Sequence, residues 1–312
     1  MVSAKSNNVE VAVIILTMNQ RDTTLLCLTS FYSVHSPPYR ILLWDNGSQD
    51  GTAEAVRQMF PQVMVHHHYE NIGVASGRNV AAKMAIEAFN PAYLFFMDND
   101  MTVTPDFLEA LVEPFGHLDH LAQTTGKIRM MGNERRIYGA GGCRINFWLG
   151  DTRHVGYTEL DRGQYDEKRK CIPSGGCMMV RADVFTHLGG FDGAFDPYGP
   201  EDLDFGLRVA RAGYYGLYVP EAIVFHDVRP GRTISSGQYT ENYAYHRVRN
   251  WFLFMDRHAS PVQKLGFLML GLPSLLIGFV IRQSKRGNLL ASLRALGRGT
   301  YDYWKSSLKS RR

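Results

Sequence analysis

The chain has 312 residues, of which 45% are hydrophobic and 21% are charged. This balance is typical of a globular protein, and 30 Gly with 13 Pro are too few for a collagen-like or wholly disordered chain. Four scattered cysteines, Cys27, Cys143, Cys171 and Cys177, exclude a disulfide framework, and no pair has the C-x-x-C spacing of a zinc site. We expect them to pack as small hydrophobic side chains in a protein of the reducing cytosol.

The net charge of +4 conceals an uneven distribution. Residues 260–312 contain ten Lys or Arg and one acid, Asp302, so this segment carries +9 and the remainder of the chain carries −5. An acidic body with a basic tail predicts an anionic surface as partner, either a membrane or a nucleic acid.

Strands and helices alternate through the first hundred residues. Residues 1–8 are polar and contain no secretory signal, so we expect a cytoplasmic protein. The pattern then predicts, in order, a buried strand over 9–16, a helix over about 22–32 capped by Asp22 or Thr23, a strand over 40–44, a helix over 52–59, a strand over about 62–65, a helix over about 76–88 and a strand over 93–97. This alternation predicts an α/β fold with a mostly parallel central sheet flanked by helices. Beyond Pro105, we expect residues 124–169 to form strands and loops over the sheet edge.

Polar residues follow three of the predicted strands. They are Thr17 and Asn19, then Asp45, then Asp98 and Asp100. Ligands of open α/β sheets bind outside the carboxyl ends of the strands, so these residues predict a ligand site there.

Asp98 and Asp100 stand two apart at the end of a strand, so their side chains can point to one side while Asn99 faces away. Two carboxylates suit Mg²⁺ or Mn²⁺, which share their ligand shell with substrate phosphates. An ordinary acidic turn is the alternative.

Asp45 can accept a hydrogen bond from the imide N–H of a uracil or thymine ring, although Asp-Asn-Gly-Ser is also a strong turn former. Arg78 and Asn79 fall one turn into a helix that begins near Gly73, where backbone N–H groups and a guanidinium can meet phosphate or ribose. The alternative for Arg78 is an exposed arginine without a role.

A second group of candidates lies between residues 174 and 227. Gly175 and Gly176 allow a close approach of the backbone to a sugar. Glu201 and Asp202 follow Pro200; if Pro200 occupies the first helical turn, one carboxylate can enter a cleft as a general base while the other caps the helix. His226, at a strand end, can complete the metal shell beside the aspartates. The run of histidines at 66–68 alternates faces along a strand and is interpreted as surface.

Taken in order, these motifs resemble the family 2 glycosyltransferases with the GT-A fold. The stretches that carry the resemblance are Thr17-Met-Asn19, Asp45-Asn-Gly-Ser-Gln-Asp-Gly-Thr52, Asn71-Ile-Gly-Val-Ala-Ser-Gly-Arg-Asn79, Asp98-Asn-Asp100 and Gly199-Pro-Glu-Asp-Leu-Asp204. Tyr245-His-Arg-Val-Arg-Asn250 looks like a segment of bacterial rhamnosyltransferase-like members.

The resemblance implies an inverting transfer of one sugar from a nucleotide-diphosphate donor, with a UDP or dTDP sugar favoured, to an acceptor hydroxyl in cell-surface glycan or lipid-linked saccharide synthesis. It implies Asp202 as the base with Glu201 beside it, and Asp98, Asp100 and His226 as ligands of Mn²⁺ or Mg²⁺. The implied donor-binding residues are Thr17, Asn19, Asp45, Gly73, Arg78, Asn79, Asp98, Asn99, Gly175, Gly176 and Arg249. Because no Gln-x-x-Arg-Trp motif follows, a processive synthase is a poor match.

Two other functions remain open on the sequence. A sugar-nucleotide pyrophosphorylase shares the strand–helix start and the divalent metal, but would need a Gly-rich loop after the first strand. A catalytically inactive nucleotide-sugar-binding module is the second alternative, and the adjacent carboxylates at 201 and 202 disfavour it.

We expect a GT-A catalytic domain over residues 1–258, with its nucleotide-binding half at about 1–104 and its acceptor half at about 105–258, followed by a basic helical region over 259–312. Residues 265–281 carry no charge but are short for a membrane span and are interrupted by Pro and Gly, which favours a packed or re-entrant hairpin or helices in the membrane interface. Leucines at helical spacing after residue 288, with nearby arginines, predict a basic amphipathic helix on an anionic membrane, with a homodimer contact or a subdomain contact as the alternative. The uncharged run beside the basic residues favours lipid over nucleic acid.

Overall fold

The computed structural model describes residues 10–173, 176–228, 241–284 and 289–310. Its strands are β1 (Val11–Thr17), β2 (Tyr39–Asn46), β3 (Met64–His68), β4 (Tyr93–Asp98), β5 (Met101–Val103), β6 (Leu121–Met130), β7 (Asn133–Ala140), β8 (Cys143–Asn146), β9 (Asp151–His154), β10 (Arg169–Cys171), β11 (Cys177–Arg181) and β12 (Tyr215–His226). Its helices are α1 (Arg21–Ser30), α2 (Thr52–Met59), α3 (Val74–Phe89), α4 (Phe107–Val112), α5 (Ala182–His187), α6 (Glu201–Arg211), α7 (Glu241–His258), α8 (Pro261–Gly266), α9 (Leu272–Ser284) and α10 (Leu289–Ser310), with short helical turns η1 (Phe31–Ser33), η2 (Glu113–Gly116), η3 (Gly193–Phe195) and the π-helical η5 (Phe267–Gly271).

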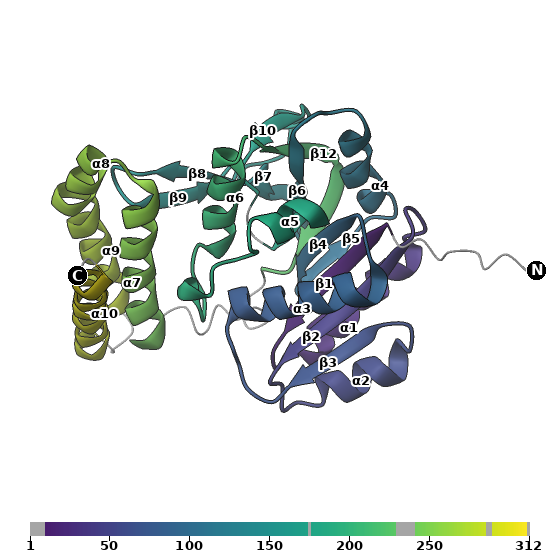
Figure 1. The fold of residues 1–312 in the computed structure, drawn as a ribbon, viewed down its shortest axis with the longest axis horizontal. Coiled ribbons are helices and arrows are strands. Elements are labelled where there is room, and N and C mark those ends of the chain that lie inside the picture. Colours follow the sequence, from purple (N-terminus) through teal and green to yellow (C-terminus); the bar gives the residue numbers. More distant parts are fainter. Residues whose placement is uncertain (1–9, 174–175, 229–240, 285–288, 311–312) are drawn as a thin grey trace, which may run out of the picture.

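The main sheet has the strand order β10-β12-β6-β11-β4-β1-β2-β3. Strands β4, β1, β2 and β3 run parallel, as the sequence predicts. β11 pairs antiparallel with both β4 and β6, and β5, β7 and β10 also pair antiparallel, so the sheet as a whole is mixed. The α/β class is confirmed, and Figure 1 shows helices on both faces of the parallel half.

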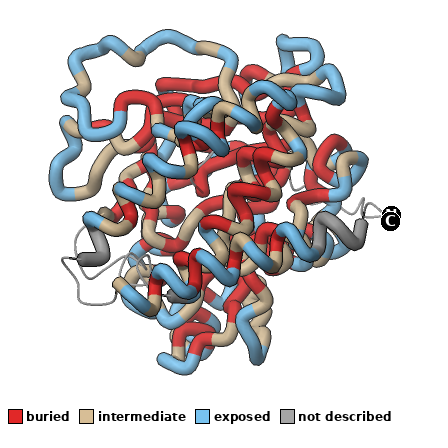
Figure 2. The backbone as a smooth tube through the Cα atoms, turned by 90° about the vertical axis from the view of Figure 1, so that its left-hand side faces the viewer, coloured by how far each residue is buried: buried red, intermediate tan, exposed pale blue. Residues whose placement is uncertain are grey.

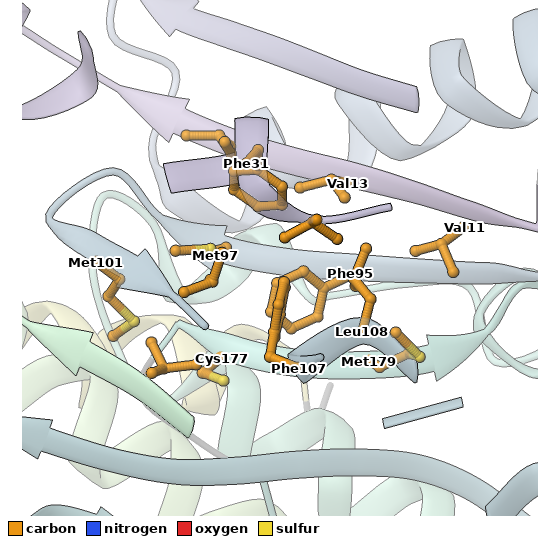
Figure 3. Close-up of a cluster of buried hydrophobic side chains, with 14 of the residues drawn as sticks. Val11, Val13, Phe31, Phe95, Met97, Met101, Phe107, Leu108, Cys177 and Met179 are labelled. Carbon is orange, nitrogen blue, oxygen red and sulfur yellow. The ribbon is translucent and has the colours of Figure 1, made fainter. Parts of the chain in front are cut away.

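The core lies on both faces of this sheet. Alternate residues of β1 belong to different hydrophobic clusters. Val11 and Val13 pack on one face of the sheet with Phe31 and Phe107, whereas Ala12 belongs to the cluster on the other face. Figure 3 shows the first of these clusters, in which side chains of β1, β4 and β11 meet those of α4. A strand buried on both faces explains why its sequence is almost continuously apolar.

Most predicted elements of the first half form within a few residues of the expected bounds. Helix α2 covers Thr52–Met59 as predicted, but α1 begins after Gln20 and has no side-chain cap, so the predicted capping by Asp22 or Thr23 is wrong. The prediction for residues 124–169 is also wrong in part, because β6 lies inside the sheet between β11 and β12. Gln123, Thr124 and Thr125 are buried in β6, although three consecutive polar residues in a sequence are more typical of a loop.

The last helices form a separate bundle at one end of the molecule (Figure 1). A third hydrophobic cluster joins Trp251 and Phe254 of α7 to Phe267, Phe279 and Tyr303 of the following helices. Residues from 261 to 284 follow one continuous helical path through α8, η5 and α9, not a hairpin. The boundary at residue 258 stays a prediction, although the cluster contains residues from both sides of it.

Candidate active site

The ends of three neighbouring strands lie side by side at one edge of the parallel sheet. In the strand register Thr17 of β1 is opposite Asp45 of β2, and Leu16 of β1 is opposite Asp98 of β4. The polar residues that follow these strands therefore meet, as the sequence argument requires.

Asp45 is completely buried, and both of its carboxylate oxygens accept hydrogen bonds. The backbone N–H of Ser48 donates to Oδ1 at 2.8 Å, and Nδ1 of His67 lies 3.0 Å from Oδ2. Asn19 connects the same loops, because its backbone N–H donates to Ser48 Oγ and its side-chain oxygen accepts from Gln49 N. Asn19 has φ 52°, a left-handed conformation that asparagine tolerates. Hydrogen bonds thus join the loop after β1 to the loop after β2 at this edge of the site.

Residue His67 belongs to β3, together with His66 and His68, and none of the three is fully exposed. His66 stacks on Trp44 with ring centroids 4.6 Å apart. The interpretation of these histidines as surface residues is therefore right only in part: all three are half-buried on alternating faces of β3, and His67 contacts Asp45.

Thr17, Thr24 and Asn99 form a second closed network beneath the strand ends. The Asn99 amide donates to Thr17 Oγ1 at 3.1 Å and to Thr24 Oγ1 at 2.9 Å, and the two hydroxyls lie 2.8 Å apart. All three side chains are buried. Asn99 turns away from the carboxylates beside it, as predicted, and fastens the Asp98–Asp100 turn to β1 and α1.

The two aspartates of this turn occupy different positions. β4 ends at Asp98, so Asp100 lies beyond the strand and the predicted two-residue strand alternation does not apply. Asp98 is partly exposed and contacts Arg78, whereas Asp100 is largely buried and has Oδ2 3.2 Å from His226 Nε2. The backbone N–H of Asp227 donates to the Asp100 carbonyl at 2.8 Å, which joins the end of β12 to the turn.

His226 is held beside three carboxylates. Its burial disfavours protonation, but the hydrogen bond to Asp100 and the charges of Asp100, Asp98 and Asp227 outweigh this and raise the pKa of His226. An imidazole drawn toward its charged form by carboxylates indicates a strongly negative pocket, which is the environment that a cation prefers.

A divalent cation fits this donor set only if part of its shell comes from elsewhere. Among the residues that the structure describes, no three His, Cys, Asp or Glu side chains gather closely enough to hold a metal alone. Asp100 Oδ1 is nevertheless buried without a hydrogen-bond partner, which is costly unless a ligand completes it. Mg²⁺ and Mn²⁺ commonly take one or two carboxylates plus substrate phosphates, and Asp98, Asp100 and His226 match that requirement.

Arg78 of α3 connects the metal turn to α6. Its guanidinium is buried, with NH2 2.7 Å from Asp98 Oδ1 and NH1 3.2 Å from Glu201 Oε1. Burial opposes the charge, but Asp98, Glu201 and Asp202 together raise the pKa of Arg78. The arginine is therefore a permanent cation between two carboxylates, not an exposed helix residue.

Glu201 and Asp202 begin α6 but face different surroundings. Burial, with the charge of Asp202, raises the pKa of the Glu201 carboxyl although Arg78 opposes the shift. Asp202 lines a cavity of about 260 Å³ together with Tyr198, Gly199 and Pro200. Pro200 is the N-cap residue and neither carboxylate provides a side-chain cap from that position, so the predicted capping is wrong. The predicted division of labour, with one of the two carboxylates in a cleft, agrees with this geometry.

The same cavity also receives side chains from β9 and α7. His154 and Thr152 come from β9, whereas Tyr243, Arg247 and Trp251 come from α7. Burial lowers the pKa of His154, while Asp202 acts in the opposite direction. An imidazole, two aromatic rings and an exposed cation around a carboxylate can surround a sugar that carries an anionic group. Of these five residues only Arg247 lies in a motif that the sequence offered, the Tyr245–Asn250 segment; the others carry no motif and were missed.

Arg249 and Asn250 hold a loop. Arg249 NH1 donates to the Ala194 carbonyl at 3.1 Å, and the buried amide of Asn250 donates to the carbonyls of Phe195 at 2.6 Å and Tyr198 at 3.0 Å. These bonds fix the chain just before Asp202. Arg249 is absent from the cavity lining, where Arg247 stands instead.

The beginning of α3 is occupied by Asp196 and is not open to an anion. Asp196 Oδ1 accepts from Ala75 N at 2.9 Å and Oδ2 accepts from Ser76 N at 3.2 Å. A Cβ on Gly73 would lie 2.2 Å from the same carboxylate, so a side chain there would clash. The expectation that free N–H groups at this helix start meet phosphate is therefore wrong, and Asp196 was missed.

Asn79, one turn later, pairs its side-chain amide with both the N–H and the carbonyl of Phe191, at 2.8 Å and 2.7 Å. Gly176 has φ +66°, and a Cβ there would lie 2.0 Å from Asp98 Oδ2, so this glycine allows the backbone to approach the carboxylate. Gly175 lies outside the described residues.

The model of the family described as "Glycosyl transferase family 2" matches residues 12–189, more than half of the chain. The chain belongs to this family. It is a glycosyltransferase that uses a nucleotide-sugar donor, and the resemblance inferred from the motifs is confirmed; neither a pyrophosphorylase nor an inactive binding module is favoured.

Two curated relatives cover most of the chain. The N-acetylglucosaminyl-diphospho-decaprenol L-rhamnosyltransferase of Mycobacterium tuberculosis is 29% identical over 240 residues, which is 71% of this chain and 76% of the relative. Glycosyltransferase AglE of Haloferax volcanii is 28% identical over 227 residues, 70% of this chain and 67% of that protein. The similarity to bacterial rhamnosyltransferases is thus confirmed.

Two solved structures share the fold. GalNAc-T7, solved with UDP, GalNAc and Mn²⁺, superposes with a TM-score of 0.61 at 19% identity and covers 78% of this chain, which spans 48% of that one. The mannosyltransferase PcManGT of Pyrobaculum calidifontis, solved with GDP-Man and Mn²⁺, gives a TM-score of 0.56 at 18% identity over 96% of this chain and 77% of its own. The GT-A fold is confirmed.

Proposed function

We propose that this glycosyltransferase moves a single deoxyhexose, with inversion, from a UDP or dTDP donor to a hydroxyl of a sugar that is linked to a lipid through diphosphate. The observation that carries the proposal is the position of Asp202 at the start of α6, lining a cavity of about 260 Å³ next to the Arg78–Glu201–Asp98 group. The acceptor class comes from the Mycobacterium tuberculosis relative, whose name specifies such a substrate.

In the proposed reaction the acceptor hydroxyl occupies the cavity and Asp202 removes its proton. The bond between the anomeric carbon and the acceptor oxygen forms as the bond to the diphosphate oxygen breaks, so the electron pair leaves with the nucleoside diphosphate. Arg78 donates a hydrogen bond to Glu201 and another to Asp98, so the guanidinium holds both carboxylates. Asp202 is then the carboxylate that faces the acceptor. Asp45 and Thr17 are buried, so with Asn19 beside them they are proposed to hold the loops that receive the base and ribose of the donor.

Asp98 and Asp100, with His226, are the residues proposed to hold Mn²⁺ or Mg²⁺. When bound, such a cation offsets the negative charge that grows on the leaving diphosphate. Support comes from Asp100 Oδ1, which is buried without a hydrogen-bond partner, and from His226, whose Nε2 lies 3.2 Å from Asp100 Oδ2. We expect Asp100→Ala to abolish the difference in donor affinity that calorimetry measures with and without Mn²⁺, while the matched Asp119→Ala, at an exposed turn residue, retains it. Equal affinities with and without Mn²⁺ in the unchanged protein would remove the metal from the proposal.

Product analysis tests the proposed reaction directly. The protein is incubated with nucleotide deoxyhexoses and a short-chain lipid-diphosphate sugar, and the anomeric configuration of the product is read by NMR. One added residue of inverted configuration is the expected result. Retention of configuration, or addition of many residues, would contradict an inverting single transfer. Since the acceptor is lipid-linked, we also propose that the protein works peripherally at the cytoplasmic face of a membrane.

A further inference from the structure

An apolar surface runs along the helical path from residue 261 to 281. Its exposed side chains include Leu265, Met269, Leu270 and Ile277, besides Val262, Leu268 and Ile281, and Trp148 at the tip of the β8–β9 hairpin lies against Gly266 of the same path. We call Leu265, Met269, Leu270, Ile277 and Trp148 the apolar ridge. Met269 is 67% exposed and Trp148 is 50% exposed, which is unusual for such large hydrophobic side chains. Figure 2, which looks onto this end of the molecule, shows exposed and buried segments alternating along the helices.

The opposite side of the same helical path is packed into the protein. Phe267 and Phe279 are buried in the cluster that includes α7 and α10. Gly266 and Gly271 lie against the hairpin tip, because a Cβ would come within 2.5 Å of the Trp148 ring at one and of the Leu149 carbonyl oxygen at the other. The hairpin and the helical path are therefore one unit, with one packed side and one side that nothing in the described chain covers.

Length and composition alone would allow residues 261–281 to cross a membrane. The packed side argues against a crossing, since α7 lies alongside and carries Asp256 and Arg257. A spanning helix would bring these charges into hydrocarbon, which is costly. A helix with one packed side and one apolar side instead suits the plane of the interface.

Charge distinguishes a lipid surface from a second copy of this chain. Residues 260–312 carry ten Lys or Arg and one acid, and Arg294, Arg298 and Lys305 are exposed on α10. Two such segments would repel each other across a dimer contact, whereas anionic headgroups would neutralise them. Tyr301 and Trp304 are also exposed on α10, and such amphipathic rings favour the headgroup region.

We propose that the apolar ridge and the basic face of α10 bind in the plane of an anionic bilayer, and that the β8–β9 hairpin sets the distance between that bilayer and the cavity. The hairpin has Trp148 at its tip, while Cys143 and His154 at its base and Thr152 nearer the tip line the cavity of Asp202. Four residues per strand correspond to roughly 13 Å, at about 3.3 Å each. The inference that a lipid-linked acceptor reaches the cavity across this distance rests on the proposed function. The inference that this surface binds lipid does not.

Vesicle flotation of the full chain tests the proposal without donor or acceptor. We expect flotation with vesicles of phosphatidylcholine and phosphatidylglycerol, little with phosphatidylcholine alone, and a loss in high salt. Leu265→Asp and Met269→Asp should each weaken binding about tenfold or more, because each removes one inserted side chain. Met59→Asp, which changes an equally large exposed methionine on α2, should bind as the unchanged protein does. A blue shift of tryptophan emission on vesicles should diminish in Trp148→Phe.

Three results would overturn the proposal. The first is equal flotation of Met269→Asp and Met59→Asp. The second is resistance of the bound protein to alkaline carbonate extraction, which would indicate a membrane span. The third is a dimer, detected by light scattering, that Met269→Asp dissociates while the unchanged protein binds no lipid. Transfer to a water-soluble acceptor is measured on the same variants. Retained transfer with lost flotation separates failure of the membrane surface from failure of the proposed reaction.

Discussion

The strand ends of β1, β2 and β4 and the cavity at the start of α6 form two sides of the candidate site, and they differ in how deeply their polar side chains are buried. Asp45 and Asn99 are buried, and together with Asn19 they form hydrogen bonds to neighbouring segments. Asp202 and Arg247 are less buried and line a cavity, although Asp202 Oδ1 also accepts from the backbone N–H of Leu203 at 2.7 Å. The first side is preorganised before any ligand binds, while the second retains groups that can meet an acceptor. Arg78 connects the two sides through Asp98 and Glu201.

Removing that connection should give the largest effect on the fold. Arg78→Ala leaves the buried Glu201 without its cation, so we expect a loss of about 3 kcal/mol in the free energy of unfolding, measured by urea titration. Arg57→Ala, which removes an exposed pair with Glu54, should change stability by less than about 1 kcal/mol. Similar losses in both variants would mean that Arg78 does not join the two sides.

The strand-end side can be tested through the donor base. Asp45→Asn should weaken UDP binding about tenfold in calorimetry, because the carboxylate that accepts from Ser48 N–H and from His67 is replaced by a neutral amide and the loops around the base lose this support. Asp50→Asn alters another carboxylate of the same loop, whose Oδ1 accepts from the backbone N–H of Thr52, and should leave the affinity nearly unchanged. Equal weakening by both changes would mean that Asp45 has no particular role in holding the donor base.

The support behind the cavity can be tested with acid. Asp204 is buried in α6 and pairs with His258 at 2.8 Å and with Arg208 at 2.8 Å. Burial acts against ionisation, but the hydrogen bonds from His258 and Arg208 prevail and hold the pKa of Asp204 below its usual value of 3.8. Its stabilising contribution is therefore complete above that value and is lost as the pH falls below it.

Asp204→Asn should accordingly reduce stability at neutral pH by about 1 kcal/mol and flatten its decline in acid. Unfolding in urea at a series of pH values measures both. An unchanged acid profile in the variant would show that other carboxylates govern the decline.

The difference between the two sides also explains what the sequence could predict. Asp45 and Asp98 follow apolar strands, and adjacent parallel strands necessarily bring their ends together, so local pattern was enough to place them. The same local reasoning identified Glu201 and Asp202 as a helix start. It could not determine which carboxylate faces Arg78, because that depends on the packing of α3 against α6.

The remaining errors come from contacts between distant segments. Asp196 occupies the start of α3 from 120 residues away, and His154 reaches the cavity from a short hairpin without a motif. β6 was placed at the edge because the stretch that begins at Thr124 is irregular and rich in Gly and Arg. In the structure the hydroxyls of Thr124 and Thr125 donate to the carbonyls of Leu111 and Cys177 inside the sheet. The hydrogen bonds of such buried polar residues join segments that are distant in the sequence, so local sequence patterns do not reveal them.

The most direct test of the account measures transfer rate and donor affinity on the same preparation of Asp202→Asn. If Asp202 is the base on the cavity side and the donor binds at the strand ends, kcat should fall about a hundredfold or more while the donor Kd from calorimetry stays unchanged. Asp119→Asn serves as the matched control and should retain both. A donor affinity that collapses together with kcat, or a kcat that survives, would contradict the assignment of Asp202.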